Sequence, residues 1–197
     1  KTAIALSLAV HVAMGLPFGR HATAKANVLY LAGENPEDLR LRLQGLRQFL
    51  FQGSGTALDS LTIAYARFPL ATNLGHLKAL GERSGGFGLV VVDSSAAFFP
   101  GEDENSNTEM VSYALLQRSL CDLPGRPCVL VLNHPSKYVD GPEALLPRGG
   151  SAYLNELDAN LTVWKSGDIV ELHNNKVRGP SFEVIQVKLS VYAFTGL

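Results

Sequence analysis

The sequence predicts an α/β fold, with a mainly parallel sheet flanked by helices and antiparallel strands at its C-terminal edge. Short runs that are apolar throughout alternate with helical segments as far as about residue 133, which is typical of a parallel sheet covered on both faces. After about Asn160 three further strands follow one another with short turns, which favours antiparallel pairing. We find no internal repeat or long linker, so we expect residues 1–197 to form a single domain.

The first segment, Thr2–Met14, is predicted to be a helix that ends at Gly15-Leu16-Pro17. It is apolar like a signal segment, but it is shorter than the roughly 20 residues that span a bilayer. We therefore interpret it as a buried helix and expect no membrane association. No methionine precedes it, so we expect that the chain is trimmed or that its first residues were not observed.

The second predicted helix, Pro36–Phe51, is amphipathic, and Pro36, Glu37 and Asp38 suit its first turn and the positive end of its dipole. Further helices are expected around Leu74–Glu82 and over Asn107–Leu120. The strands expected in the parallel sheet are Asn27–Ala32, Leu61–Ala64, Gly88–Asp93 and Pro127–Asn133, and those of the antiparallel part are Leu161–Lys165, Asp168–Asn174 and Phe182–Leu189.

Composition and charge set limits on the function. The 197 residues are 46% hydrophobic and 18% charged, which is ordinary for a globular protein with one sizeable core. The net charge of −1 argues against a protein that coats nucleic acid along its whole surface, although a local basic strip can exist. Cys121 and Cys128 lack a metal-ligand pattern, so we interpret them as thiols of a reducing cytoplasm, with a disulfide as the alternative.

Three polar residues follow predicted parallel strands, at the sheet edge where ligands bind in such folds. Glu34 could polarise a water as a general base, or it could cap the following helix. Asp93 could support a Mg²⁺ ion, or it could be a turn-forming aspartate. His134 could sense a phosphate group, or it could be a structural histidine.

Lys1-Thr2 opens the first helix. A phosphate-binding loop ends in Gly-Lys-Ser/Thr, where the lysine reaches the β and γ phosphates and the hydroxyl binds Mg²⁺. Only these last two residues are present, so we expect the chain to begin within such a loop. The pair indicates a nucleotide site only in combination with the acids farther along.

Two cationic residues and two loops are the remaining candidates for a functional role. Lys176 and Arg178 lie between late strands, where they could be solvated or could reach a neighbouring subunit's nucleotide in a ring. The acidic loop Gly101–Glu109 is interpreted as a solvated loop and helix cap, with cation binding as the alternative. The loop Val139–Ser151, which contains Arg148, is an ordinary mobile surface loop or a DNA-facing one.

Together these motifs resemble the RecA-like P-loop ATPases of the hexameric plasmid helicase RepA type, which are related to DnaB-type replicative helicases. The resemblance covers nearly the whole chain. It is carried, in order, by Lys1-Thr2, Gly33-Glu34-Asn35-Pro36, Val91-Val92-Asp93-Ser94, Asp103-Glu104-Asn105, Asn133-His134-Pro135-Ser136-Lys137, Arg148-Gly149-Gly150-Ser151-Ala152 and Lys176-Val177-Arg178-Gly179-Pro180.

The resemblance implies a cytoplasmic ATPase that uses ATP and Mg²⁺, forms a hexameric ring and acts on single-stranded DNA. It implies that Lys1 and Thr2 hold the phosphates, that Thr2 and Asp93 serve the metal, and that Glu34 is the catalytic base. His134 would be a γ-phosphate sensor linked to the DNA loops. Lys176 and Arg178 would act in trans across a subunit interface.

The sequence departs from the family pattern at three places. The glycine-rich half of the phosphate loop is missing, Gly33-Glu34-Asn35 replaces Ala-Glu-Asp, and Asn133 replaces a second histidine before His134. We expect an ATP-hydrolysing nucleic-acid motor, a replicative DNA helicase of a plasmid, phage or integrated element. The alternatives are a non-motor ATPase that acts as a switch or loader and a degenerate fold without catalysis.

Overall fold

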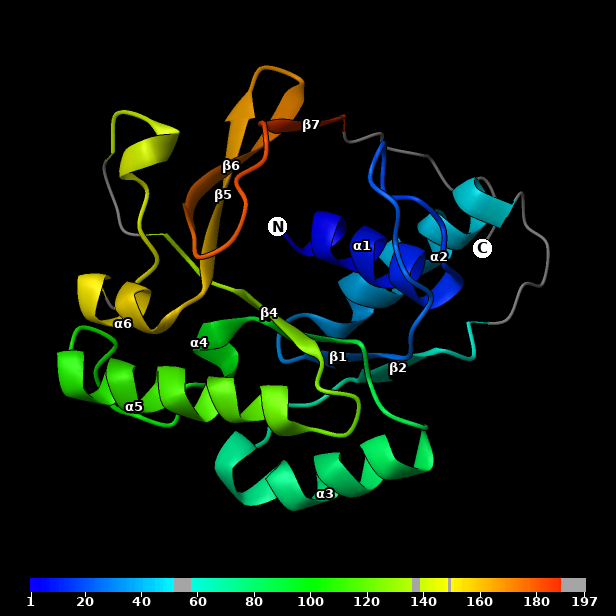
Figure 1. The fold of residues 1–197 in the computed structure, drawn as a ribbon, viewed down its shortest axis with the longest axis horizontal. Coiled ribbons are helices and arrows are strands. Elements are labelled where there is room, and N and C mark those ends of the chain that lie inside the picture. Colours follow the sequence, from blue (N-terminus) through cyan, green and yellow to red (C-terminus); the bar gives the residue numbers. More distant parts are fainter. Residues whose placement is uncertain (52–57, 136–138, 149, 189–197) are drawn as a thin grey trace. The chain divides into compact units, whose positions relative to one another are not determined.

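The computed structural model describes residues 1–51, 58–135, 139–148 and 150–188 (Figure 1). The chain divides into two compact units. The first consists of Lys1–Pro100 and Leu115–Asn133, and the second of Gly101–Ala114 and His134–Leu197. The single domain expected from the sequence stays a prediction. Ser136, Lys137 and Gly149 of the family motifs lie outside the described residues, as does the predicted end of the last strand at Leu189.

The first unit contains a sheet of four parallel strands in the order β2-β1-β3-β4. All residues of the two central strands are buried, which confirms the predicted parallel sheet with both faces covered. In the register, Val28 lies opposite Leu89 and Ala32 opposite Asp93. The strands are β1 (Val28–Ala32), β2 (Leu61–Ala64), β3 (Leu89–Asp93) and β4 (Cys128–Leu132).

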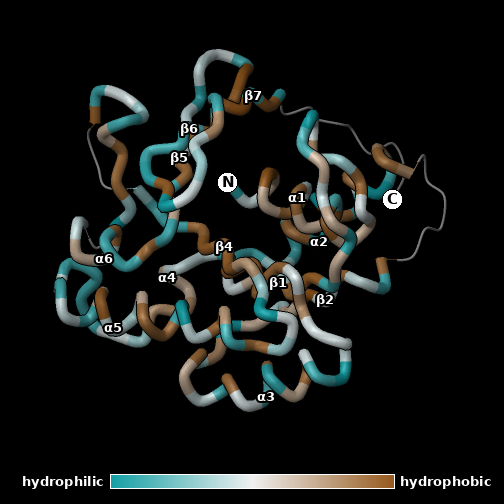
Figure 2. Tube along the Cα trace, viewed as in Figure 1, coloured by the Kyte–Doolittle hydropathy of each residue, from teal (hydrophilic) through white to brown (hydrophobic). Residues whose placement is uncertain are grey.

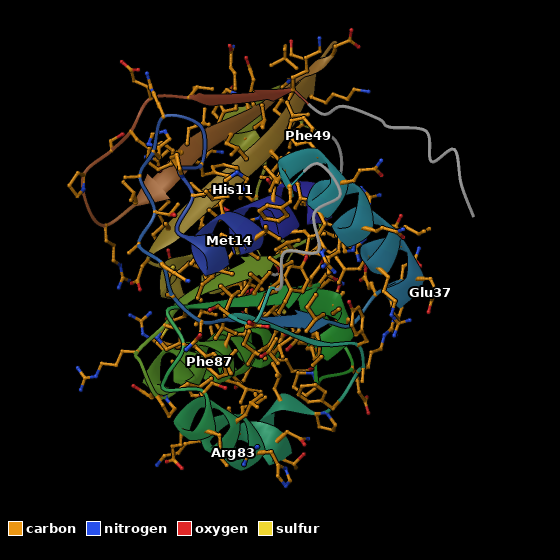
Figure 3. All side chains as sticks on the ribbon, turned by 90° about the vertical axis from the view of Figure 1, so that its right-hand side faces the viewer. His11, Met14, Glu37, Phe49, Arg83 and Phe87 are labelled. Atoms are coloured by element: carbon orange, nitrogen blue, oxygen red, sulfur yellow. The ribbon has the colours of Figure 1, made fainter. Side chains whose placement is uncertain are left out.

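Helices cover both faces of this sheet. In Figure 1, α1 (Thr2–Met14) and α2 (Pro36–Phe51) lie on one side of the strands, and α3 (Leu70–Arg83) lies on the other. Figure 3 shows the same division, with His11 and Met14 on the α1 side and Phe87 on the α3 side. The bounds of α1 and α2 are those predicted from the sequence.

The core of the first unit is formed where α1 packs on the sheet. Ala5, Leu6 and Ala9 recur with helical spacing and are buried against alternate residues of the central strands, among them Tyr30 and Val91. Figure 2 shows this concentration of hydrophobic residues along α1 and the strands, whereas α3 alternates between hydrophobic and polar.

Local chemistry sets the ends of both helices. α1 ends at Gly15, whose φ of 69° is in the left-handed region that a glycine adopts without strain. α2 begins after Asn35, whose Oδ1 accepts a hydrogen bond from the backbone N–H of Asp38 at 3.3 Å. Since Asn35 caps this helix, the alternative that Glu34 serves as its capping acid loses its support.

Two differences from the prediction occur in the first unit. α3 begins at Leu70, four residues before the expected Leu74, and in its first turn Thr72 and Asn73 donate side-chain hydrogen bonds to the carbonyl of Pro69 at 3.2 and 2.9 Å. The short helix α4 (Ser95–Phe98) was not expected.

The helix α5 (Asn107–Arg118) has residues in both units, and it continues as the 3₁₀ turn η1 (Ser119–Asp122).

The second unit contains an antiparallel sheet in the order β5-β6-β7, which confirms the predicted antiparallel pairing. These strands form a sheet of their own. The elements are η2 (Pro142–Ala144), α6 (Gly150–Glu156), β5 (Ala159–Ser166), β6 (Ile169–Val177) and β7 (Ile185–Lys188).

The strand β6 is longer than the predicted Asp168–Asn174. Lys176 lies within it and pairs with Asn160, so its expected position between strands was wrong. The pairing continues past Asn174 because a β-bulge between Asn160 and Leu161 absorbs the change in register.

Two further findings bear on the sequence analysis. Among the described residues, no helix is both long and apolar enough to cross a bilayer. Cys121 and Cys128 are not joined by a disulfide bond, which agrees with the interpretation of both as thiols.

Candidate functional site

The order of the parallel strands reverses between β1 and β3. The chain runs from β1 to β2 on one side, then crosses to β3 on the other side of β1 and continues outward to β4. In open α/β sheets, the carboxyl ends of the strands at such a reversal frame the usual ligand site. Glu34 follows β1 and Asp93 ends β3, so both residues lie at this point.

Asp93 is the buried acid of the site, with 6% of its surface exposed. Alternation along β3 places its side chain on the face that α1 covers. The hydroxyl of Thr2, in the first turn of α1, donates to Oδ1 of Asp93 at 3.3 Å. The structure therefore brings together the two residues that the sequence predicted as the metal ligands.

Tyr30 holds the other oxygen of this carboxylate. Its hydroxyl donates to Oδ2 of Asp93 at 2.6 Å. Burial raises the pKa of the Tyr30 phenol above its usual range, and the neighbouring charge of Asp93 raises it further, so the hydroxyl stays protonated and remains a donor. Sequence reasoning missed Tyr30; the available signal was a lone hydroxyl in an otherwise aliphatic strand.

Glu34 is fixed by a second residue that sequence reasoning missed. The hydroxyl of Ser94, which is buried directly after Asp93, donates to Oε1 of Glu34. The backbone N–H of Gly33 also donates to the carbonyl of Asp93 at 2.7 Å. The ends of β1 and β3 are thus joined through both backbone and side chains.

Gly33 is required where β1 meets α4. A Cβ atom at this position would lie 2.5 Å from Cβ of Ala97 and 2.8 Å from Cε2 of Phe98, which is closer than real Cβ contacts. The carbonyl of Gly33 accepts a hydrogen bond from Nε of Arg67 at 2.7 Å. In the family motif an alanine occupies this position. The close packing against Ala97 and Phe98 gives a physical reason why this chain has glycine instead.

Lys1 reaches the same edge of the sheet from the start of α1. Its Nζ donates to the carbonyl of Asn133, the residue that follows β4. The N-terminal end of a helix carries a partial positive charge and unpaired N–H groups, which favour an anion such as phosphate. The first unit therefore brings together Lys1, Thr2, Glu34 and Asp93.

Residues 1–138 match the AAA_25 family, which is described as an AAA domain. The chain belongs to this family. The match covers every residue of the first unit and extends just past β4.

Two solved structures share the fold of this AAA domain. One, described as an ATPase domain, matches with a TM-score of 0.69 and 13% identity, over 94% of this chain and 76% of that one. A DnaB-like replicative helicase, solved for its interactions with primase, matches with a TM-score of 0.68 and 14% identity, over 96% of this chain and 53% of that one. A search of curated proteins found no match. The shared fold confirms the RecA-like fold that the sequence resemblance implied.

Three further predicted site residues, His134, Lys176 and Arg178, belong to the second unit of the chain. His134 is half-buried, and its carbonyl accepts a hydrogen bond from the backbone N–H of Arg148 at 3.0 Å. The roles of His134, Lys176 and Arg178 in the site stay predictions.

Lys176 and Arg178 both contact the C-terminal end of α6 and the residues after it. Nζ of Lys176 donates to the carbonyl of Leu154 at 2.6 Å. The guanidinium of Arg178 donates to Oδ1 of Asp158 at 3.0 Å and to the carbonyl of Asn155 at 3.2 Å. Neither cation is simply solvated.

In the acidic loop Gly101–Glu109, a side-chain carboxylate accepts hydrogen bonds from the backbone of the loop itself. The Glu109 carboxylate accepts hydrogen bonds from the N–H groups of Glu102 and Asp103 at 2.9 and 3.2 Å, and Arg148 pairs with Glu104 at 3.1 Å. Among the described residues, no group of three or more His, Cys, Asp or Glu side chains could hold a metal ion. These contacts favour the interpretation as a loop and helix cap over a cation site.

Mg²⁺ needs fewer protein ligands than such a cluster provides. In nucleotide sites it is held by one or two protein oxygens together with phosphate oxygens and waters. The Thr2 hydroxyl and the Asp93 carboxylate, 3.3 Å apart at the start of a helix, are oxygen donors of this kind. The residues present therefore fit a magnesium–nucleotide site.

Proposed function

We propose that this AAA domain hydrolyses ATP and drives a ring-forming replicative DNA helicase of a plasmid, phage or integrated element. The observation that carries the proposal is the convergence of Lys1, Thr2, Glu34 and Asp93 where the strand order reverses. A cation, a hydroxyl and two acids at a helix start and two adjacent strand ends are the parts that phosphoryl transfer to water requires.

Each side chain has a distinct role in this proposal. Lys1 binds the β and γ phosphates as a point charge. Thr2 and Asp93 would hold Mg²⁺, which, when bound, neutralises charge on the phosphate oxygens. Glu34 orients the attacking water and accepts its proton, and the hydrogen bond from Ser94 keeps its carboxylate in one orientation.

The helicase part of the proposal is supported by the fold shared with a structure described as a DnaB-like replicative helicase. We propose a cytoplasmic hexameric ring that moves on single-stranded DNA. In this ring His134 senses the γ-phosphate, and Lys176 and Arg178 stabilise transition-state charge in the neighbouring subunit's site.

The test is ATP hydrolysis by the full-length protein with its complete phosphate-binding loop, measured with and without single-stranded DNA. We expect turnover that DNA stimulates, and we expect Glu34→Gln to abolish turnover while ATP binding persists. Glu37→Gln is the matched control, because Glu37 is an exposed acid in the first turn of α2 that pairs locally with Arg40.

Each outcome separates the candidate functions. Turnover that is indifferent to DNA would favour the alternative, a RecA-like ATPase that acts as a switch or loader. Hydrolysis that survives Glu34→Gln would overturn the assignment of the base. Absence of turnover in the wild-type protein would favour a degenerate fold.

A further inference from the structure

The packing of β1 does not by itself require the hydroxyl group of Tyr30. Every residue of β1 is buried, and Tyr30 has no exposed surface. A phenylalanine would fill the same volume against α1 without a polar atom to satisfy, whereas a buried hydroxyl needs a hydrogen-bond partner. The partner that Tyr30 has is the acid at the site, Asp93.

The sheet register explains how Tyr30 reaches this acid. Ala32 lies opposite Asp93, and Tyr30 lies two residues earlier on the same face. The phenol therefore extends diagonally toward the end of the adjacent strand. Its 2.6 Å distance to Oδ2 is typical of a hydroxyl that donates to a carboxylate.

The two oxygens of Asp93 have different partners. Oδ2 accepts from Tyr30 within the core, and Oδ1 accepts from Thr2 at the start of α1. The terminal torsion of an aspartate has a broad energy profile, so hydrogen bonds must fix the plane of its carboxylate. The bond from Tyr30 is the shorter of the two.

We propose that Tyr30 is a positioning residue that holds Oδ2 of Asp93 so that Oδ1 stays directed at Thr2 and the metal. This inference rests on the proposed function, in which Thr2 and Asp93 serve Mg²⁺. Residues that orient metal ligands typically contribute about 10–100-fold to metal affinity or activity.

The test compares Tyr30→Phe with the wild type in the full-length protein with its complete phosphate-binding loop. The first measurement is Mn²⁺ affinity of the ADP-loaded protein by electron paramagnetic resonance, since Mn²⁺ takes the same oxygen ligands as Mg²⁺. We expect affinity to fall by about 10-fold or more. The second measurement is the Mg²⁺ concentration for half-maximal ATP hydrolysis, which we expect to rise by a similar factor.

The matched control is Tyr153→Phe, which removes the hydroxyl of another tyrosine with no exposed surface, in α6. It is expected to leave Mn²⁺ affinity unchanged. If Tyr30→Phe folds poorly, the same change is made together with Gly75→Ala, which is expected to stabilise α3.

The inference is overturned if Mn²⁺ affinity in Tyr30→Phe stays within twofold of the wild type, or if the ADP-loaded wild type does not bind Mn²⁺. The proposed function fails separately, if the wild type binds Mn²⁺ in a Tyr30-dependent manner but does not hydrolyse ATP. Hydrolysis with unchanged affinity in Tyr30→Phe would leave the function standing and reduce Tyr30 to a packing residue.

Discussion

Ser94 donates its hydroxyl hydrogen bond to Glu34 across the point where the strand order reverses. Ser94 is buried and follows β3, whereas Glu34 is half-buried and follows β1, so the bond depends on how these two strands pair. A glutamate that must orient a water gains from such a fixed partner, because its side chain otherwise samples several rotamers.

Ser94→Ala is expected to lower kcat for ATP hydrolysis by about 10-fold, which is about 1.4 kcal/mol in the activation barrier, with little change in ATP affinity. The matched control is Ser95→Ala, since Ser95 is also buried and its hydroxyl is 3.4 Å from Nε2 of Gln117. Steady-state kinetics and ATP-binding calorimetry make the comparison. A kcat for Ser94→Ala within twofold of the wild type would contradict the role of this bond.

Gly33→Ala is expected to lower the free energy of unfolding by about 1–3 kcal/mol, because the added methyl group overlaps Ala97 and Phe98. Gly75→Ala is the contrasting variant. Gly75 lies within α3 with nothing within 4 Å of the new Cβ, so we expect a gain of about 0.5–1 kcal/mol. Urea unfolding measures both, and a Gly33→Ala protein as stable as the wild type would show that α4 can move aside.

Asn35→Ala is expected to lower the free energy of unfolding by about 1 kcal/mol, since it removes the side-chain cap of α2. The φ of 37° at Asn35 adds to the loss, because alanine tolerates positive φ less well than asparagine. Asn35→Gly keeps this backbone conformation accessible and is expected to lose only a few tenths of a kcal/mol. Thermal unfolding ranks the variants; equal losses in the two variants would contradict the effect of the positive φ, and no loss in Asn35→Ala would contradict the role of the cap.

The parts of the fold that sequence predicted are those set by local chemistry. The helix Pro36–Phe51 was predicted with both ends correct, since Asn35-Pro36 starts it and its apolar residues follow one face. The edge of the sheet where Glu34 and Asp93 meet was also predictable, because parallel strands end on the same side. Lys1 and Thr2 could be placed there only through the resemblance to P-loop ATPases.

The parts that sequence did not predict depend on contacts between strands. Tyr30 and Ser94 act on Asp93 and Glu34 through the pairing of β1 with β3, and a single sequence does not give that register. The helix Ser95–Phe98 is too short for a periodic signal. Lys176 was predicted to lie between strands because no sequence pattern indicates the β-bulge that extends β6.

Arg178→Ala is expected to lower DNA-stimulated ATP turnover by about 10³-fold or more if the arginine acts in trans. Asp158→Asn is the control, because it removes the exposed partner of Arg178 and such pairs contribute only about 0–1 kcal/mol to stability. We expect Asp158→Asn to retain turnover. Adding Glu34→Gln subunits, which keep Arg178, to Arg178→Ala subunits should restore activity, and failure to do so would contradict action across an interface.

Glu171 provides a pH-dependent prediction in the antiparallel sheet. The Oε1 atom of Glu171 accepts a hydrogen bond from Gln186 at 3.1 Å, and Nε2 of His173 lies 3.0 Å from Oε2. These hydrogen bonds, that of Gln186 first, lower the pKa of Glu171 below its usual value. Because the ionised form is favoured in the folded state, the stability that Glu171 contributes is present above its unfolded pKa, about 4.3.

That contribution is lost as pH falls through the folded pKa of Glu171. Gln186→Val removes the larger cause but retains a residue suited to a strand, so we expect the pKa of Glu171 to move back toward its usual value. Carboxyl NMR titration measures this directly, with thermal unfolding at neutral pH to establish that β6 and β7 still pair. The stability of Gln186→Val should consequently depend less on pH in the acid range. If Glu171 titrates at the same pH in both proteins, the bond across β6 and β7 does not set its pKa.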